Sequence, residues 1–183
     1  MKKNADDDLI ARIKNGDQAA FEWIVKCHQD RIYNLCLYML KNKQNAQEAA
    51  QDVFVKAFRS LGNFQPRSSL YTWLYRIAIN TSIDHLRKTP STPADDGALM
   101  NLKSDDPSPE GCLETKEATK VVQNALQELS PELRVAIVLR EIEGLAYDEI
   151  AAALHISIGT VKSRIARARE MLRRLLREKL SVG

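Results

Sequence analysis

The chain is 183 residues long, 44% hydrophobic and 28% charged, with a formal net charge of +3 at pH 7. This length allows one domain or two small ones, and the hydrophobic fraction is enough to build packed cores. A charged amino-terminal stretch argues against a signal peptide, and no apolar run is long enough to cross a membrane. The three cysteines lack C-x-x-C spacing, which argues against a zinc site and favours reduced thiols in the cytoplasm.

The composition, with seven glycines, six prolines and few alternating β-branched runs, predicts an all-α chain. A first helix is expected to start near Asp6–Asp8, because carboxylates stabilise a helix start, and to end at Asn15–Gly16. Asp17 is then expected to cap a second helix that runs to about Lys41.

Within the second helix, Cys36 is interpreted as a small core residue and Trp23 as a packed aromatic. A third helix is expected from about Gln44 to Leu61, before the breaking pair Gly62–Asn63. Its inward row is predicted to be Ala46, Ala50, Val53, Ala57 and Leu61.

A loop at 64–69 precedes a fourth helix expected from about Ser69 to Lys88, which carries Tyr71, Trp73 and Tyr75. The 100° rotation per residue places Arg76, Asn80 and Arg87 within about 40° of one another. Such a polar stripe beside an aromatic-bearing loop suits single-stranded nucleic acid, whose bases stack on rings and whose phosphates meet cationic groups. The alternative is ordinary core aromatics with a solvated basic edge.

Residues 89–111 contain four prolines, five acidic residues and one lysine, without an apolar period. We therefore expect a flexible acidic linker at 89–112, between a first domain at 1–88 and a second at 113–183. An extended chain of this length spans at most about 75–80 Å. Two rigid lobes on such a tether can reach two sites about 70 Å apart, or roughly two turns of duplex.

The second domain is expected to begin with a helix from Leu113 to about Leu129, with Val122 among its inward residues. Ser130 is expected to cap the next helix, and Pro131 fits the first turn of that helix. Ile142 is expected to pack inward near the end of this helix, which Gly144 would close.

Residues 145–180 predict a short helix, a turn at His155–Ile156 and a long helix capped by Ser157, which is the helix-turn-helix arrangement. The long helix has an apolar stripe at Val161, Ile165, Ala168, Leu172 and Leu175. Eight basic and two acidic residues lie between 157 and 180, and Lys162 and Arg167 lie opposite the apolar stripe, where they can face a major groove. The alternative is a solvated basic helix that packs on its own domain.

Two blocks of motifs carry a resemblance to a known family. The runs QDVFVKAFR at 51–59 and YTWLYRIAINT at 71–81 resemble the front domain of bacterial extracytoplasmic-function (ECF) sigma factors, in particular the envelope-stress branch. The second domain of that family resembles this chain at 130–134, 139–141, 144–151 and 159–164. The resemblance therefore covers nearly the whole chain in the same order.

This resemblance implies a protein that joins core RNA polymerase, positions it on a promoter and stabilises the opened strand, without catalysis. It assigns polymerase docking to Gln51, Asp52, Phe54, Lys56 and Arg59, although charges of both signs equally suit a solvated surface. It assigns recognition and melting of the minus-ten element to Phe64, Arg67, Ser68, Ser69, Tyr71, Trp73, Tyr75, Arg76, Asn80 and Arg87. It assigns recognition of the minus-thirty-five element to Thr160, Lys162, Ser163, Arg164 and Arg167.

The partners that the resemblance implies are core RNA polymerase, promoter DNA and an anti-sigma factor, with no cofactor and no metal. It implies a cytoplasmic bacterial protein without stable membrane insertion, which an anti-sigma partner could hold at the inner membrane. A free chain held ready for such a partner is expected to be compact, with polymerase- or DNA-facing surfaces covered. We also hypothesise that the negative charge of the linker imitates nucleic acid in the polymerase RNA channel.

One residue departs from the family pattern, because many relatives have Ser or Thr where this chain has Ala146. Glu149 remains three residues later, so one half of a capping box is kept. A lost side-chain cap typically costs about 1 kcal/mol, and the short helix of the motif is expected to fray unless a neighbour such as Tyr147 compensates.

Two other classes of protein stay open. A stand-alone helix-turn-helix regulator would need neither a polymerase-docking helix nor a melting loop. A recombinase or nuclease would need paired carboxylates or a nucleophile in a folded pocket. The acidic clusters of this chain lie instead at the amino-terminal start and in the linker, which are poor places to hold a metal rigidly.

Overall fold

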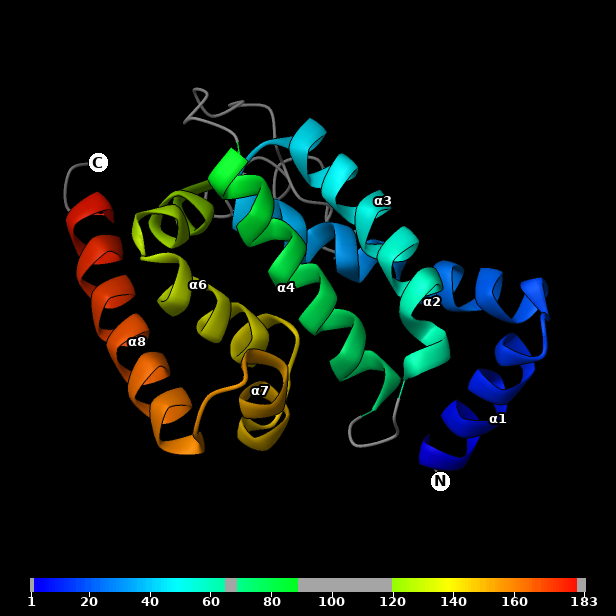
Figure 1. The fold of residues 1–183 in the computed structure, drawn as a ribbon. Helices are drawn as coiled ribbons and strands as arrows, with labels where there is room; N and C mark the ends of the chain where they lie inside the picture. Colours follow the sequence, from blue (N-terminus) through cyan, green and yellow to red (C-terminus); the bar gives the residue numbers. More distant parts are fainter. Residues whose placement is uncertain (1, 65–68, 89–119, 181–183) are drawn as a thin grey trace, which may run out of the picture.

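The computed structural model describes residues 2–64, 69–88 and 120–180, whose regular structure is helical throughout (Figure 1). The front lobe consists of α1 (Lys2–Lys14), α2 (Gln18–Leu40), α3 (Lys43–Ser60), the 3-10 turn η1 (Leu61–Asn63) and α4 (Leu70–Lys88). The rear lobe consists of a helix at 120–128, α6 (Pro131–Ile137), the π-helical turn η2 (Val138–Ile142), α7 (Tyr147–Leu154) and α8 (Ile158–Leu180). The all-α prediction is confirmed, whereas the predicted linker at 89–112 lies outside the described residues.

The start of α2 is fixed by the cap that the sequence predicts. The carboxylate of Asp17 accepts a hydrogen bond from the backbone N–H of Ala20 (3.1 Å) and pairs with the guanidinium of Arg12 (2.8 Å). The hydrogen bonds from Arg12 and Ala20 lower the pKa of Asp17. By contrast, α1 begins at Lys2, ahead of the predicted start near Asp6–Asp8, because a favourable dipole term is too weak to fix a helix end alone.

The front core forms where α2, α3 and α4 pack against one another. All five predicted inward residues, four in α3 and one directly after it, are buried as expected. Cys36 is also fully buried, as expected. Burial raises the pKa of the Cys36 thiol to about 11, so this thiol stays protonated at neutral pH. The prediction for Trp23 is wrong, since this side chain is 56% exposed; its neighbour Ile24 takes the buried position instead.

The rear core contains the apolar stripe of α8, with Val161, Ile165 and Ala168 fully or almost fully buried. Two predicted inward residues, Val122 and Ile142, are exposed by 43% and 40%. The reason for Ile142 is the π-helical turn, in which the N–H of Glu143 bonds five residues back to the carbonyl of Val138, so the 3.6-residue period no longer holds.

The start of α6 also departs from the prediction. Pro131 occupies the first turn as expected, but the Ser130 hydroxyl makes no capping bond to the backbone. Only the Ser130 carbonyl takes part in the helix, where it accepts from the N–H groups of Leu133 (3.1 Å) and Arg134 (2.9 Å).

The two lobes pack against each other, with α7 beside α4 and α6 against α2 (Figure 1). Polar contacts join them at the carboxyl end of α2: Gln127 donates to the carbonyl of Tyr38 (2.7 Å), and Arg134 donates to that of Met39 (2.8 Å). Arg134 is buried, has no carboxylate partner among the residues that the structure describes, and donates also to the carbonyls of Leu126, Gln127 and Leu129. The described residues thus form a compact arrangement, in which the predicted docking residues of α3 and recognition residues of α8 are for the most part exposed.

Candidate nucleic-acid and polymerase interfaces

The helix-turn-helix of the rear lobe is built as the sequence predicts. α7 ends at His155, which has the left-handed φ of 53°, and the chain then turns into α8. The hydroxyl of Ser157 accepts from the backbone N–H of Thr160 (3.0 Å) and so caps α8. This cap and the packing of Val161 and Ile165 fix the direction of the long helix.

The predicted recognition residues of α8 differ in exposure. Lys162, Ser163 and Arg167 are exposed, whereas Thr160 and Arg164 are half-buried. The Ser163 hydroxyl donates to the carbonyl of Thr160 (2.9 Å), which leaves its oxygen lone pairs able to accept from a base. The exposed row therefore combines two cations with a hydroxyl, groups that suit phosphates and base edges.

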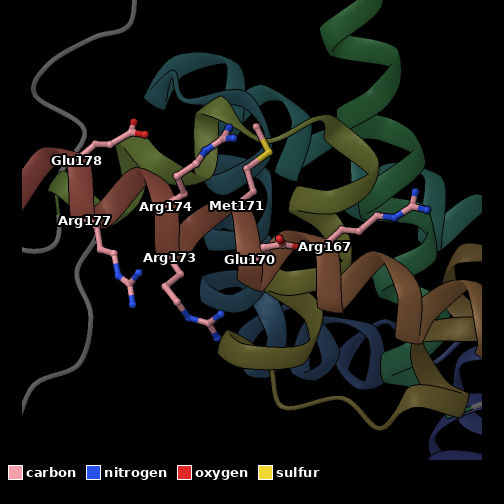
Figure 2. Close-up of a pocket in the computed structure, with 7 residues that line it drawn as sticks. All are labelled: Arg167, Glu170, Met171, Arg173, Arg174, Arg177 and Glu178. Carbon is pink, nitrogen blue, oxygen red and sulfur yellow. The ribbon is translucent and has the colours of Figure 1, made fainter.

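Further arginines extend this face toward the carboxyl end of α8. Figure 2 shows that Arg173 and Arg177 project to one side of the helix, away from Arg174 and Met171. Arg169 is engaged within the lobe, because its guanidinium bonds the carboxylate of Glu141 (2.5 and 3.0 Å), a contact that raises the pKa of Arg169. The positive charge of α8 is thus only partly available to a ligand.

The start of α7 keeps one half of a capping box. The Glu149 carboxylate accepts from the N–H of Ala146 (2.8 Å), but the methyl group of Ala146 cannot accept the reciprocal bond. Arg140 supports this end: its guanidinium lies 4.9 Å from the ring centre of Tyr147 and donates to the carbonyl of Leu145 (2.8 Å). Tyr147, the neighbour expected to compensate for the missing cap, is thus held by a cation–π contact with Arg140.

The predicted single-strand residues of the front lobe divide into buried and exposed groups. Trp73, Tyr75 and Phe64 are 6%, 0% and 5% exposed, and the Phe64 and Trp73 rings meet edge to face at 5.2 Å. In this arrangement the protein covers these rings and leaves no face open to a base, which agrees with the alternative that they are ordinary core aromatics. Asn80 and Arg87 are exposed, and their assignment stays a prediction.

Two of the remaining predicted single-strand residues, Ser69 and Arg76, make contacts within the protein. The Ser69 hydroxyl accepts from the N–H of Thr72 (3.1 Å) and so supports the start of α4. Arg76 is half-buried, with its guanidinium 3.4 Å from the imidazole of His155 in the rear lobe. Arg67 and Ser68 lie outside the described residues.

A polar cluster joins α4 to the rear lobe. The carboxylate of Glu143 accepts from the hydroxyl of Tyr71 (3.0 Å) and from that of Tyr75, and the two hydroxyl oxygens lie against each other. Arg31 of α2 donates to the Tyr71 hydroxyl (3.1 Å). Burial raises the pKa of Tyr71 to about 12, and burial together with Glu143 raises that of Tyr75 further. Nothing in the sequence signalled this cluster, because Glu143 is far along the chain from the tyrosines.

The predicted polymerase-docking residues lie along α3. Gln51, Asp52, Lys56 and Arg59 are exposed and Phe54 is half-buried. Asp52 pairs with His85 (3.0 Å), and Lys56 donates to the hydroxyl of Thr81 (3.0 Å) and lies 3.7 Å from Asp84, so both tie α3 to α4.

Beside this face, a groove runs between α2 and α3. It is lined by Val25, Gln29, Asp30, Tyr33, Gln47, Ala50, Gln51, Phe54 and Val55. No local sequence pattern indicates the contribution of α2, because Val25 and Tyr33 come to lie beside Phe54 only when the two helices pair.

Within the part of the chain that the structure describes, no group of three or more His, Cys, Asp or Glu residues could hold a metal ion. None of the described helices is both long and apolar enough to span a bilayer.

Each of the two lobes matches a known protein family. A family model described as Sigma-70 region 2 matches residues 24–91, and one described as Sigma-70, region 4 matches residues 119–172. The RNA polymerase sigma-H factor of Pseudomonas aeruginosa is 39% identical, over 96% of each chain. The ECF RNA polymerase sigma-E factor of Escherichia coli is 37% identical, over 91% of this chain and 92% of that protein.

Solved structures show the same fold. CnrH in complex with the cytosolic domain of CnrY superposes with a TM-score of 0.73 at 27% identity, covering 95% of this chain and 98% of that one. The sigma factor RpoE of Bartonella quintana, in complex with the anti-sigma factor NepR, gives a TM-score of 0.67 at 28% identity, covering 86% of this chain and 96% of that one.

A front lobe that matches region 2 and a helix-turn-helix lobe that matches region 4 define a bacterial sigma factor of the sigma-70 class. Within that class, the chain belongs to the ECF sigma factors, as its identity with the sigma-H and sigma-E proteins over almost its full length shows. A stand-alone regulator is not supported, because region 2 accounts for the front lobe.

Proposed function

We propose that this chain divides promoter recognition between its lobes: α3 binds core RNA polymerase, α4 holds the opened strand, and α8 recognises the upstream duplex. The observation that carries the proposal is the exposed row Lys162, Ser163 and Arg167 on a helix whose start is fixed by the Ser157 cap. Phosphate contacts from such a helix give salt-dependent affinity, and base contacts give sequence choice. The chain acts by binding, and the polymerase performs the nucleotide chemistry.

Polymerase docking is supported by the α2–α3 groove. Phe54 and Val55 supply apolar surface along this groove, and Val55 is 47% exposed. Gln51 and Arg59 are exposed on the same helix and can supply polar contacts at the rim. Asp52 and Lys56 hold α3 against α4, so they would position the docking face as well as contact the enzyme.

Strand binding is supported by the exposed Asn80 and Arg87 of α4. An amide and a guanidinium on one helical stripe can meet base edges and backbone phosphates of an opened strand. Trp73 and Phe64 would act beneath this surface, by holding the start of α4 and the adjoining loop in place. Arg67, Ser68 and Ser69 would act from the loop itself.

An anti-sigma factor is the proposed regulator. Both solved relatives that share this arrangement of lobes over most of their length are complexes, with the cytosolic domain of CnrY and with the anti-sigma factor NepR. A partner of that kind would keep the lobes together. It would hold a cytoplasmic chain away from polymerase, and a membrane-bound partner would hold it at the inner membrane.

The test is run-off transcription by sigma-free core polymerase on genomic promoter fragments, with and without the purified chain. We expect promoter-dependent transcripts only when the chain is present. Absence of such transcripts from a chain that is shown to be free of any inhibitor would contradict the proposal.

A further inference from the structure

The Tyr71–Tyr75–Glu143 cluster combines two hydrogen-bond donors of the front lobe with an anion, the carboxylate of Glu143, that the rear lobe contributes. Two hydroxyl groups from successive turns of α4 converge on one carboxylate oxygen of Glu143. Arg31 of α2 donates to the Tyr71 hydroxyl at 3.1 Å, and its guanidinium carbon lies 5.5 Å from the centre of the Tyr71 ring. Arg31, Tyr71 and Tyr75 therefore form an anion cradle on the front lobe, and Glu143 is the only member from the rear lobe among the residues of this cluster.

The chemistry of the anion cradle suits an oxyanion in general. Both tyrosines are protonated at neutral pH, and in the docked arrangement burial raises the pKa of Tyr71 to about 12 and that of Tyr75 further, so each hydroxyl has a proton to donate. Arg31 is always charged, so the cradle offers neutral donors and a positive charge, and hydrogen bonds to ionised acceptors are the strong ones. A carboxylate and a phosphodiester both present oxygen acceptors with negative charge, and both fit such donors.

The position of the cradle identifies which of these ligands it would meet. It lies on α2 and α4, and α4 also carries Arg76, Asn80 and Arg87, the residues proposed to bind the strand. The rear lobe contacts Arg76 as well, because His155 of the helix-turn-helix lies 3.4 Å from its guanidinium. The same docking of the rear lobe thus occupies the cradle and part of the neighbouring strand-binding stripe.

We propose that Arg31, Tyr71 and Tyr75 form a backbone-phosphate site for single-stranded DNA, and that Glu143 occupies this site when the lobes are together. The inference rests on the proposed strand-binding role of α4 and adds Arg31 as a ligand and Glu143 as a competitor. Strand binding and lobe docking then exclude each other, because one set of donors serves both acceptors. Removing the competitor raises the fraction of chains that can bind, and the apparent affinity rises with that fraction.

The test uses the full chain, a fluorescein-labelled oligothymidylate and fluorescence anisotropy at two salt concentrations. Glu143→Gln keeps the size of the side chain and removes its charge, and we expect about fivefold tighter binding of the oligonucleotide. Glu132→Gln is the matched control, because Glu132 is exposed at the start of α6 in the rear lobe and takes no part in the cradle; its binding should equal that of the wild type. Arg31→Gln should weaken binding and reduce the salt slope by about one.

Two further measurements separate the outcomes. Small-angle scattering should show a larger radius of gyration for Glu143→Gln, and Tyr75→Phe, which removes one donor, should bind the oligonucleotide more weakly than the wild type. If Glu143→Gln opens the lobes while oligonucleotide affinity stays unchanged, the cluster is only an interlobe contact and the inference is wrong. Unchanged affinity in Arg31→Gln overturns it too, even where the chain supports normal promoter-dependent transcription, so its failure differs from failure of the proposed function.

Discussion

The two candidate DNA faces of this chain differ in accessibility. On α8 the residues Lys162 and Arg167 are exposed in the compact arrangement, whereas on α4 the side chain of Tyr75 is fully buried and Arg76 is half-covered by the rear lobe. The proposed duplex face is therefore accessible, while only the part of the proposed strand face at Tyr75 and Arg76 depends on separation of the lobes. The contrast teaches that residues whose chemistry suits DNA equally well can differ in exposure, because the packing of the lobes covers some of them and not others.

The largest effect is expected from substitution of Arg134, because this residue makes hydrogen bonds both within the rear lobe and to the front lobe. Arg134→Met leaves the buried carbonyls of Leu126, Gln127 and Leu129 without their donor, and it should reduce the free energy of unfolding by about 3 kcal/mol. Urea unfolding followed by circular dichroism measures this loss. Arg169→Met, which removes an arginine from an exposed ion pair, should change stability by less than about 1 kcal/mol; equal losses in the two variants would contradict the role of Arg134.

The accessible face is tested next by Arg167→Ala. Loss of this exposed guanidinium should weaken binding of a duplex carrying the upstream promoter element by about tenfold, the effect of one good base or phosphate contact. Gel-shift titration with the polymerase holoenzyme measures it. Arg169→Ala is the matched control on the same helix, since Arg169 is bound to Glu141. A comparable loss in both variants would mean that only the overall charge of α8 matters.

The proposed strand face of α4 is tested by Asn80→Ala, at its exposed part. Loss of this amide should reduce promoter opening by about fivefold, the worth of roughly one net hydrogen bond, without reducing duplex binding. Permanganate reactivity of thymines in the opened region measures the effect. Asn124→Ala replaces another exposed helical asparagine, in the rear lobe, and should open promoters normally. Normal permanganate reactivity in Asn80→Ala would remove Asn80 from the strand-binding site.

The smallest effect is expected at the start of α7. Ala146→Ser supplies the missing acceptor of the capping box, which should add about 0.5–1 kcal/mol to stability. Thermal unfolding measures the gain, and Ala146→Val, which cannot accept a bond either, serves as the control. If both variants behave alike, the Arg140–Tyr147 contact has already removed the need for a cap.

Local patterns predicted the local features of this molecule. The Asp17 and Ser157 caps, the inward row of α3 and the buried Cys36 follow from the chemistry and spacing of neighbouring residues. Ile142 was misplaced because a π-helical turn changes the helical period, and Trp23 because aromatic character was taken for burial.

The nonlocal features escaped prediction for a different reason. The position of Glu143 beside Tyr71 and Tyr75 depends on how the two lobes pack, and no periodicity within either lobe specifies that packing. The burial of Trp73 and Tyr75 likewise depends on neighbours from other helices, so the aromatic residues of α4 could be named as candidates but not sorted by exposure.

The guanidinium of Arg134 has a consequence for how the chain changes shape. Three of its four carbonyl acceptors belong to its own lobe, and only the carbonyl of Met39 belongs to the other. When the lobes dissociate, Arg134 gives up a single bond that water can replace at both ends, and its surroundings otherwise persist. At Arg134, separation of the lobes would therefore cost one hydrogen bond and leave in place the three that hold its own lobe together.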